Sequence, residues 1–163
     1  MKYSRLLLLC FVCFPALVLS GCVLLPSEKP DRTISDQISG KEWLLAGYSN
    51  GNIFIPLEAD HGSRAVIEFN ADGTLEGDTG INEFSGQWTV KARRTDGSAP
   101  VSISVGDITD PLVLNETASK FEQDMLRGLN SAVRMQTGTD SFTLLSDEDT
   151  ILLYFIFRGD SLF

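Results

Sequence analysis

Cationic residues, histidine and cysteine are all scarce in this chain of 163 residues. Lysine and arginine number 13 against 22 aspartates and glutamates, which gives a formal net charge of -9 and a pI near 4.5. Nucleic-acid binding needs clustered cations, and Arg93-Arg94 is the only adjacent basic pair, so the composition argues against a nucleic-acid partner. One histidine, His61, and three cysteines supply no ligand set for zinc, so we expect no metal and no cofactor.

A hydrophobic run long enough to span a bilayer is also missing, because the longest one covers residues 6–19 and a span needs about 20 apolar residues. This run follows two basic residues and contains Pro15, which is typical of the apolar core of a secretory signal. The next residues, Leu19-Ser20-Gly21-Cys22, resemble the lipobox of bacterial lipoproteins. The pattern predicts a lipoprotein signal peptide over residues 1–21, with an ordinary cleaved signal and an incidental thiol as the alternative.

Lipidation at Cys22 would tether the protein to a membrane without crossing it, since each buried acyl methylene contributes about 0.8 kcal/mol. Cys10 and Cys13 would leave with the signal, so the exported chain could form no internal disulfide. Val23 stands in place of the aspartate that holds many lipoproteins at the inner membrane, which favours the periplasmic face of the outer membrane in a Gram-negative cell. Residues 22–39 are polar and contain prolines, which predicts an acylated N-terminus with a flexible tether.

Short β-strands separated by turn residues are the pattern of the domain expected over residues 40–163. Helical spacing of apolar residues over 116–131, with Asn115 as N-cap, predicts one helix. Hairpin-length connections dominate, so we expect an α+β, mostly β fold, in which a curved antiparallel sheet or small open β-barrel carries one packed helix. Apolar or alternating runs predict strands at residues 43–47, 53–57, 65–69, 75–77, 84–90, 101–105, 132–136, 142–145 and 151–157.

Two of these strands have a predicted place in the sheet. Pro56 cannot donate a ladder hydrogen bond, so its strand should lie at an edge. The run at residues 151–157 is apolar throughout, which is typical of a central strand covered on both faces.

Four segments in this order resemble the META/HslJ-like domain over about residues 40–157. They are Trp43-Leu44-Leu45, residues 66–73, residues 75–86 and residues 121–126. In that family a Trp-x-Leu strand precedes a Phe-x-x-x-Gly turn and a Gly-Cys-Asn-x-x-x-Gly segment. The resemblance implies a structural role for the matching residues, which are Trp43, Gly73, Gly80, Asn82 and Gly86.

Two positions depart from the family pattern, because Ile81 and Val113 stand where its two cysteines would be, the second of them four residues after Thr109. A redox or metal-binding role of that thiol pair therefore cannot be transferred to this chain. Asn82 remains, and we expect its side chain to bond nearby backbone within a turn. The resemblance implies secreted or lipid-anchored envelope proteins linked with stress tolerance, drug resistance and motility-related secretion, without catalytic residues.

Three short motifs could carry chemistry, and each has a simpler interpretation. Asp78-Thr79-Gly80 spells the aspartic-protease tripeptide, but the chain has no second copy, so a homodimer would have to supply the paired carboxylate. His61 lies in a polar loop and no Gly-x-Ser-x-Gly accompanies it, which favours a solvated histidine over a general base. Asp147-Glu148-Asp149 lacks the twelve-residue calcium loop and is typical of a solvated turn.

Two further patterns concern binding. Arg158-Gly159-Asp160 matches the integrin-binding tripeptide, although so short a motif often occurs by chance. Aromatic side chains on the alternating strands could line a ligand groove, but core packing is the usual role of large side chains in such positions. The aromatic residues in question are Trp43, Trp88, Tyr154 and Phe155.

The sequence favours a non-enzymatic envelope lipoprotein whose domain binds or protects another envelope component in stress tolerance. Its expected partners are the membrane, through the lipid at Cys22, and an envelope protein. A pilotin-like assembly factor for a secretion system is the alternative, and it would need a groove for a segment of its partner. An acid protease dimer built on Asp78 is a third candidate.

Overall fold

The computed structural model describes residues 32–57, 65–109 and 116–159. In these ranges the chain forms nine strands and two helices. In chain order they are α1 (Arg32–Ile38), β1 (Glu42–Ser49), β2 (Phe54–Pro56), β3 (Val66–Phe69), β4 (Thr74–Asp78), β5 (Glu83–Val90), β6 (Ser98–Ile108), α2 (Glu116–Ser131), β7 (Arg134–Thr137), β8 (Ser141–Leu145) and β9 (Ile151–Phe157).

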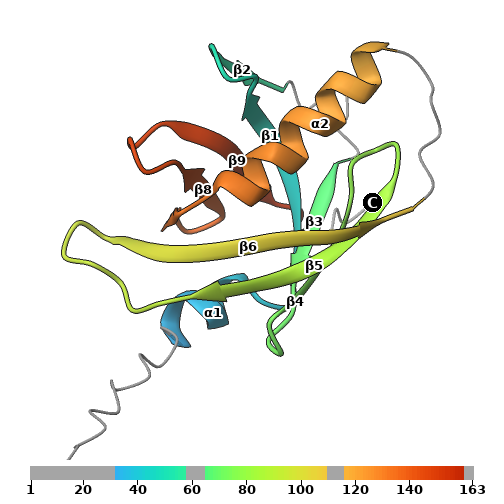
Figure 1. Cartoon of the computed structure of the whole chain (residues 1–163). Helices are drawn as coiled ribbons and strands as arrows, with labels where there is room; N and C mark the ends of the chain where they lie inside the picture. The colour runs from blue at the N-terminus through green and yellow to red at the C-terminus, as the bar shows by residue number, and fades with distance from the viewer. Residues whose placement is uncertain (1–31, 58–64, 110–115, 160–163) are drawn as a thin grey trace, which may run out of the picture.

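The strands pair with their neighbours in an antiparallel sense, in the order β2-β1-β3-β4-β5-β6-β7-β8-β9. β1 also pairs with β9, so β1 and β3 to β9 close into a barrel of eight strands (Figure 1). The expected fold class, α+β and mostly β with one helix packed on the sheet, is confirmed. The sequence suggested an open barrel, but the barrel is closed because β9 pairs with both β8 and β1.

The edge position of β2 and the central position of β9 are confirmed, whereas β9 is fully covered on one face and only partly on the other. β2, which ends at Pro56, stands at the end of the strand order and pairs with β1 alone among the described strands. β9 lies between β8 and β1. Leu153 and Phe155 of β9 are fully buried, whereas Leu152 and Ile156 are half-buried on its other face.

Aromatic side chains fill the interior of the barrel. Phe142 stacks on Phe155 with ring centroids 4.8 Å apart and meets Trp43 edge to face at 5.0 Å. Phe69 joins this cluster and contacts Trp88 edge to face at 4.8 Å. Such pairs contribute about 0.5–1.5 kcal/mol beyond the area they bury. Three of the aromatic residues considered for a groove, Trp43, Trp88 and Phe155, are therefore core residues, and the fourth, Tyr154, is half-buried.

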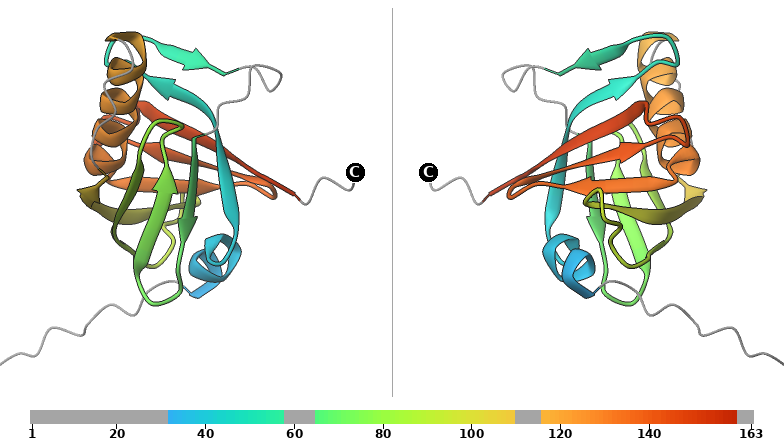
Figure 2. Two further views of the ribbon diagram at one scale, coloured as in Figure 1. Left: turned by 90° about the vertical axis from the view of Figure 1, so that its right-hand side faces the viewer. Right: turned by 90° about the vertical axis from the view of Figure 1, so that its left-hand side faces the viewer.

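Helix α2 covers the side of the barrel formed by β1, β6 and β9. Met125 and Leu129 on its apolar stripe are fully buried, as the helical spacing predicts. Figure 2 shows α2 running along one side of the barrel while α1 lies at one end. Among the described residues, no helix is long and apolar enough to cross a membrane.

The predicted flexible tether over residues 22–39 extends too far along the chain. Residues 32–38 form α1, and Ile34 and Ile38 are 0% and 1% exposed. The indole Nε1 of Trp43 donates to the carbonyl of Ile38 at 2.9 Å, which fixes the end of α1 to the barrel. Burial of each isoleucine contributes about 1.5–3 kcal/mol to the stability of the fold. The segment is polar overall, but these two residues belong to the core.

Several expectations concern residues outside the described ranges. These are the signal peptide over residues 1–21, the lipidation site Cys22, the loop residue His61, the departure from the family pattern at Val113, the helix cap Asn115 and the motif residue Asp160.

Candidate functional site

The turn between β4 and β5 contains the Asp78-Thr79-Gly80 tripeptide. Asp78 Oδ1 accepts the backbone N–H of Gly80 at 2.6 Å, and the N–H of Thr79 donates to the carbonyl of Asn82 at 3.0 Å. Asp78 therefore caps its own turn. Across the β4–β5 ladder it stands opposite Glu83, whereas an acid protease pairs two such tripeptides. In this structure the tripeptide forms a turn, and Asp78 contributes to its hydrogen bonds.

A side-chain contact joins this turn to α2. Asn82 is 5% exposed, and its Nδ2 donates to both carboxylate oxygens of Glu122, at 3.0 and 3.1 Å. Thr79 Oγ1 is 3.3 Å from Glu122 Oε1 and accepts the backbone N–H of Asn82 at 3.0 Å. The amide Nδ2 of Asn82 thus reaches helix α2, a contact that the expectation from sequence did not include. Glu122 was not identified from the sequence.

The remaining residues of the family motif lie in the core and in tight backbone contacts. Trp43 is 2% exposed. Gly73 has a φ of +91° in the turn between β3 and β4, a conformation that other residues adopt only with strain. At Gly86, a Cβ atom would lie 2.3 Å from the carbonyl oxygen of Ser104 on β6, so only glycine fits there.

A groove crosses the outer face of β3, β4 and β5 and reaches the start of β1. It encloses a cavity of about 500 Å³. Val66, Phe84 and Ile108 contribute apolar atoms to its lining, and Ile108 is 45% exposed. Its acidic residues are Glu42, Glu68, Glu76, Asp78 and Glu83. We call this surface the acidic groove.

The acidic residues of the groove stand opposite one another on neighbouring strands. Glu42 pairs in register with Glu68, which pairs with Glu76, and Asp78 pairs with Glu83. Like charges directly opposite each other destabilise a sheet. Within the described part of the chain, these acidic residues form one ion pair, in which Glu42 Oε1 lies 2.8 Å from Arg158 Nη1. Among the described residues, Arg158 is thus the one cation that pairs with these carboxylates.

The acidic groove does not have the geometry of a metal site. Among the described residues, no group of three or more histidines, cysteines, aspartates or glutamates is arranged to hold a metal ion. The carboxylates come from separate strands, and neighbouring strands are about 4.8 Å apart. The charges are consequently spread over the surface and do not converge on one point.

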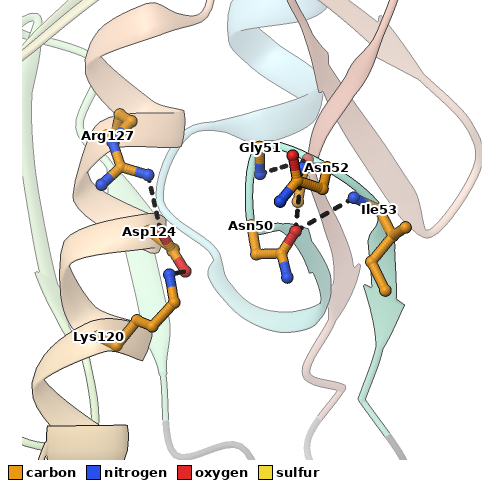
Figure 3. Close-up of polar contacts among 8 residues, drawn as sticks. Asn50, Gly51, Asn52, Ile53, Lys120, Asp124 and Arg127 are labelled. Carbon is orange, nitrogen blue, oxygen red and sulfur yellow. Dashed lines mark hydrogen bonds and ion pairs between the residues drawn. The ribbon is translucent and has the colours of Figure 1, made fainter.

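Two separate groups of polar contacts lie on α2 and in the turn between β1 and β2 (Figure 3). The Asp124 side chain is 1% exposed, and it accepts from Lys120 Nζ at 3.0 Å and from Arg127 Nη1 at 2.6 Å. In the turn, Asn50 Oδ1 accepts the backbone N–H groups of Asn52 and Ile53 at 3.0 and 3.1 Å. The buried Asp124 carboxylate is thus paired with two cations, and the Asn50 side chain stabilises its turn.

Two exposed turns contain carboxyl groups with altered titration. A hydrogen bond from Thr74 Oγ1, at 2.6 Å, and a second from the Thr74 N–H hold the pKa of Asp72 below its ordinary value of 3.8. Hydrogen bonds from the hydroxyl and the N–H of Ser98 lower the pKa of Asp96 in the same way. Both carboxylates cap hairpin turns and lie outside the acidic groove.

The other motifs from the sequence lie in turns or near the end of the chain. Arg158 of the Arg-Gly-Asp tripeptide pairs with Glu42, and its own N–H donates to the Glu42 carbonyl at 3.2 Å. Residues 147–149 form the expected solvated turn between β8 and β9. Asp149 in this turn forms an ion pair with Arg134.

A family model described as the META domain matches residues 36–156. A DUF4847 family protein from Bacteroides vulgatus, solved by crystallography, has 16% identity and a TM-score of 0.51, with 76% of this chain and 96% of that chain covered. A protein from Burkholderia xenovorans, solved by NMR, has 14% identity and a TM-score of 0.57, with 83% and 93% covered. These two structures are similar to this chain in fold alone. No curated protein matches it.

Proposed function

This chain belongs to the META domain family, and from that premise we propose that it is a non-enzymatic, lipid-anchored protein of the cell envelope. Residues 1–21 act as its signal peptide and Cys22 carries the lipid. Its domain binds another envelope component and contributes in this way to stress tolerance.

The observation that carries a binding role is the contrast between the interior of the barrel and its outer face. Aromatic rings such as Phe142 and Phe155 fill the interior, so a ligand would have no space between the strands. The acidic groove, in contrast, is open to solvent and combines neighbouring carboxylates with exposed apolar surface. Surfaces of that kind are typical of recognition sites.

The start of α1 limits how far the domain could lie from a lipid on Cys22. Arg32 is the first residue of α1, and ten residues precede it from Cys22 onwards. Extended chain spans at most about 3.5 Å per residue, so the domain would stay within about 35 Å of the lipid. Val23 after the acylated cysteine favours the periplasmic face of the outer membrane in a Gram-negative host.

A pilotin-like role in assembling a secretion system is the second candidate, because the acidic groove supplies a place for a segment of a partner protein. In a strain that lacks this protein, a carrier role predicts that the secretin no longer reaches the outer membrane. Normal secretin localisation in that strain would leave the more general binding role.

Lipidation is tested by intact-mass analysis of the full chain purified from bacterial membranes. We expect a mature protein that starts at Cys22 and carries a diacylglyceryl group. Cys22→Ser should abolish the modification and release the protein from the membrane fraction, whereas the control Cys13→Ser, within the signal, should leave both unchanged. An unmodified Cys22 in the exported protein would contradict the proposal.

A further inference from the structure

We propose that the acidic groove docks an extended cationic segment of a partner protein, in which lysines or arginines alternate with apolar residues. This inference names the partner class for the binding role proposed above and rests on it. Three features of the groove support it: the arrangement of its charges, its apolar lining and its rigid end.

The charge arrangement matches a row of cations rather than a single ion. Glu42, Glu68 and Glu76 form a continuous line across β1, β3 and β4, and each stands opposite the next. All three are exposed, and Arg158 neutralises this line at the Glu42 end. A segment with regularly spaced lysines would place a cation beside each remaining carboxylate and relieve the repulsion among them.

The apolar lining distinguishes a peptide from a small hydrated cation. Val66 is half-buried and stands opposite Asp78, while Ile108 pairs with Phe84 and is 45% exposed. A hydrated ion or a polyamine gains little from covering such a surface. Alternate side chains of an extended segment point to its two sides, so a segment lying edge-on in the groove would direct its apolar residues toward Ile108 and its cations toward the carboxylates.

One end of the groove is fixed by hydrogen bonds in the unbound protein. Asp78 and Glu83 stand on either side of the turn that Asn82 joins to Glu122 on α2. Because both hydrogen bonds of that contact involve a charged acceptor, they are stronger than neutral ones and restrict movement of the turn. A partner therefore meets carboxylates that are already positioned, which reduces the entropy lost on binding.

The proposal is tested by calorimetry on the full chain, purified in a neutral detergent at physiological ionic strength. The probes are a short peptide that alternates lysine and leucine, a matched peptide that alternates lysine and serine, spermine, and Ca²⁺. We expect the lysine–leucine peptide to bind most tightly, the lysine–serine peptide more weakly, and the two small cations more weakly still.

Matched variants locate the site. Glu68→Gln with Glu76→Gln should weaken binding of the lysine–leucine peptide by about 3-fold to 30-fold, the range expected for two exposed ion pairs. The control, Asp147→Asn with Glu148→Gln, removes the same charge from the exposed turn between β8 and β9 and should change affinity less than about 2-fold. Ile108→Ser should weaken the lysine–leucine peptide but not the lysine–serine peptide. Circular dichroism melts establish that each variant is folded.

Three results would overturn the proposal. The first is equal affinity of the lysine–leucine peptide for the wild type and for the Glu68→Gln, Glu76→Gln variant. The second is absence of peptide binding, and the third is binding of spermine or Ca²⁺ that is tighter than binding of the peptide. None of these results depends on Cys22, so a failure of the docking proposal is distinguishable from a failure of lipid anchoring.

Discussion

The side-chain amide of Asn82 donates to both carboxylate oxygens of Glu122, although the two residues are 40 positions apart in the sequence. This contact links the turn that follows β4 to helix α2. Because Asp78 and Glu83 flank that turn, the contact also holds two carboxylates of the acidic groove in place. A residue of the family motif thus connects the barrel, the helix and the proposed binding surface.

Asn82→Ala should lower the free energy of unfolding by about 1–3 kcal/mol, because it leaves the part-buried carboxylate of Glu122 without its amide donor. Urea denaturation of the full chain measures the change. The control is Glu116→Gln at the exposed start of α2, which should change stability by less than about 0.5 kcal/mol. Equal stability of the Asn82→Ala variant and the wild type would show that the contact contributes nothing.

Glu68→Gln with Glu76→Gln should raise the free energy of unfolding by about 0.2–1 kcal/mol, because the two carboxylates stand opposite each other. At high salt this increase in the free energy of unfolding should be smaller, because screening already weakens the repulsion in the wild type. Denaturation at low and high salt provides the measurement, and the Asp147→Asn, Glu148→Gln variant is the control. Destabilisation by the groove substitutions would mean that these carboxylates have a structural partner.

Ile38→Ala should lower the free energy of unfolding by about 2–5 kcal/mol, because Ile38 is 1% exposed in α1. A flexible tether over residues 22–39 predicts no change at this position. Asp36→Ala, an exposed position on the same helix, is the matched control and should have little effect. Identical thermal unfolding of Ile38→Ala and the wild type would contradict this and indicate that residues 32–38 belong to the flexible tether.

The Asp72 carboxyl should titrate below 3.8, because Thr74 donates two hydrogen bonds to its ionised form. The folded-state pKa is lower than the unfolded one, so this stabilisation is present above pH 3.8 and is lost as the pH falls through the folded pKa. NMR titration of the carboxyl measures the shift. Thr74→Val, which keeps the N–H and removes the hydroxyl, should bring the pKa of Asp72 closer to 3.8, and an unchanged value would contradict the assigned cause.

Much of the fold was predictable from the sequence because local signals determine hairpins. The Asp72-Gly73 turn sets the β3–β4 register, and the apolar run over Ile151–Phe157 identifies a central strand. Closure of the barrel was not predictable, since it depends on pairing between β1 and β9 at opposite ends of the chain. The helix over Arg32–Ile38 was missed because a short polar segment with two isoleucines gives no clear helical period.

The candidate site was only partly predictable, because some of its contacts depend on tertiary packing. Glu68 and Glu76 occupy the solvent-facing positions of their strands, and once the turn at Gly73 fixes the register they must stand opposite each other. That pair could therefore have been inferred from the sequence. The contact between Asn82 and Glu122 could not, because it depends on where α2 packs against the barrel.

The most direct test of a binding face on the outside of this barrel is an NMR titration of the full chain with the lysine–leucine peptide. Saturable shifts are expected in the backbone amides around Glu68, Glu76 and Ile108, with little change around the core residue Phe142. Shifts centred on the turn between β8 and β9, around Asp147 and Glu148, or no saturable shifts at all, would contradict it.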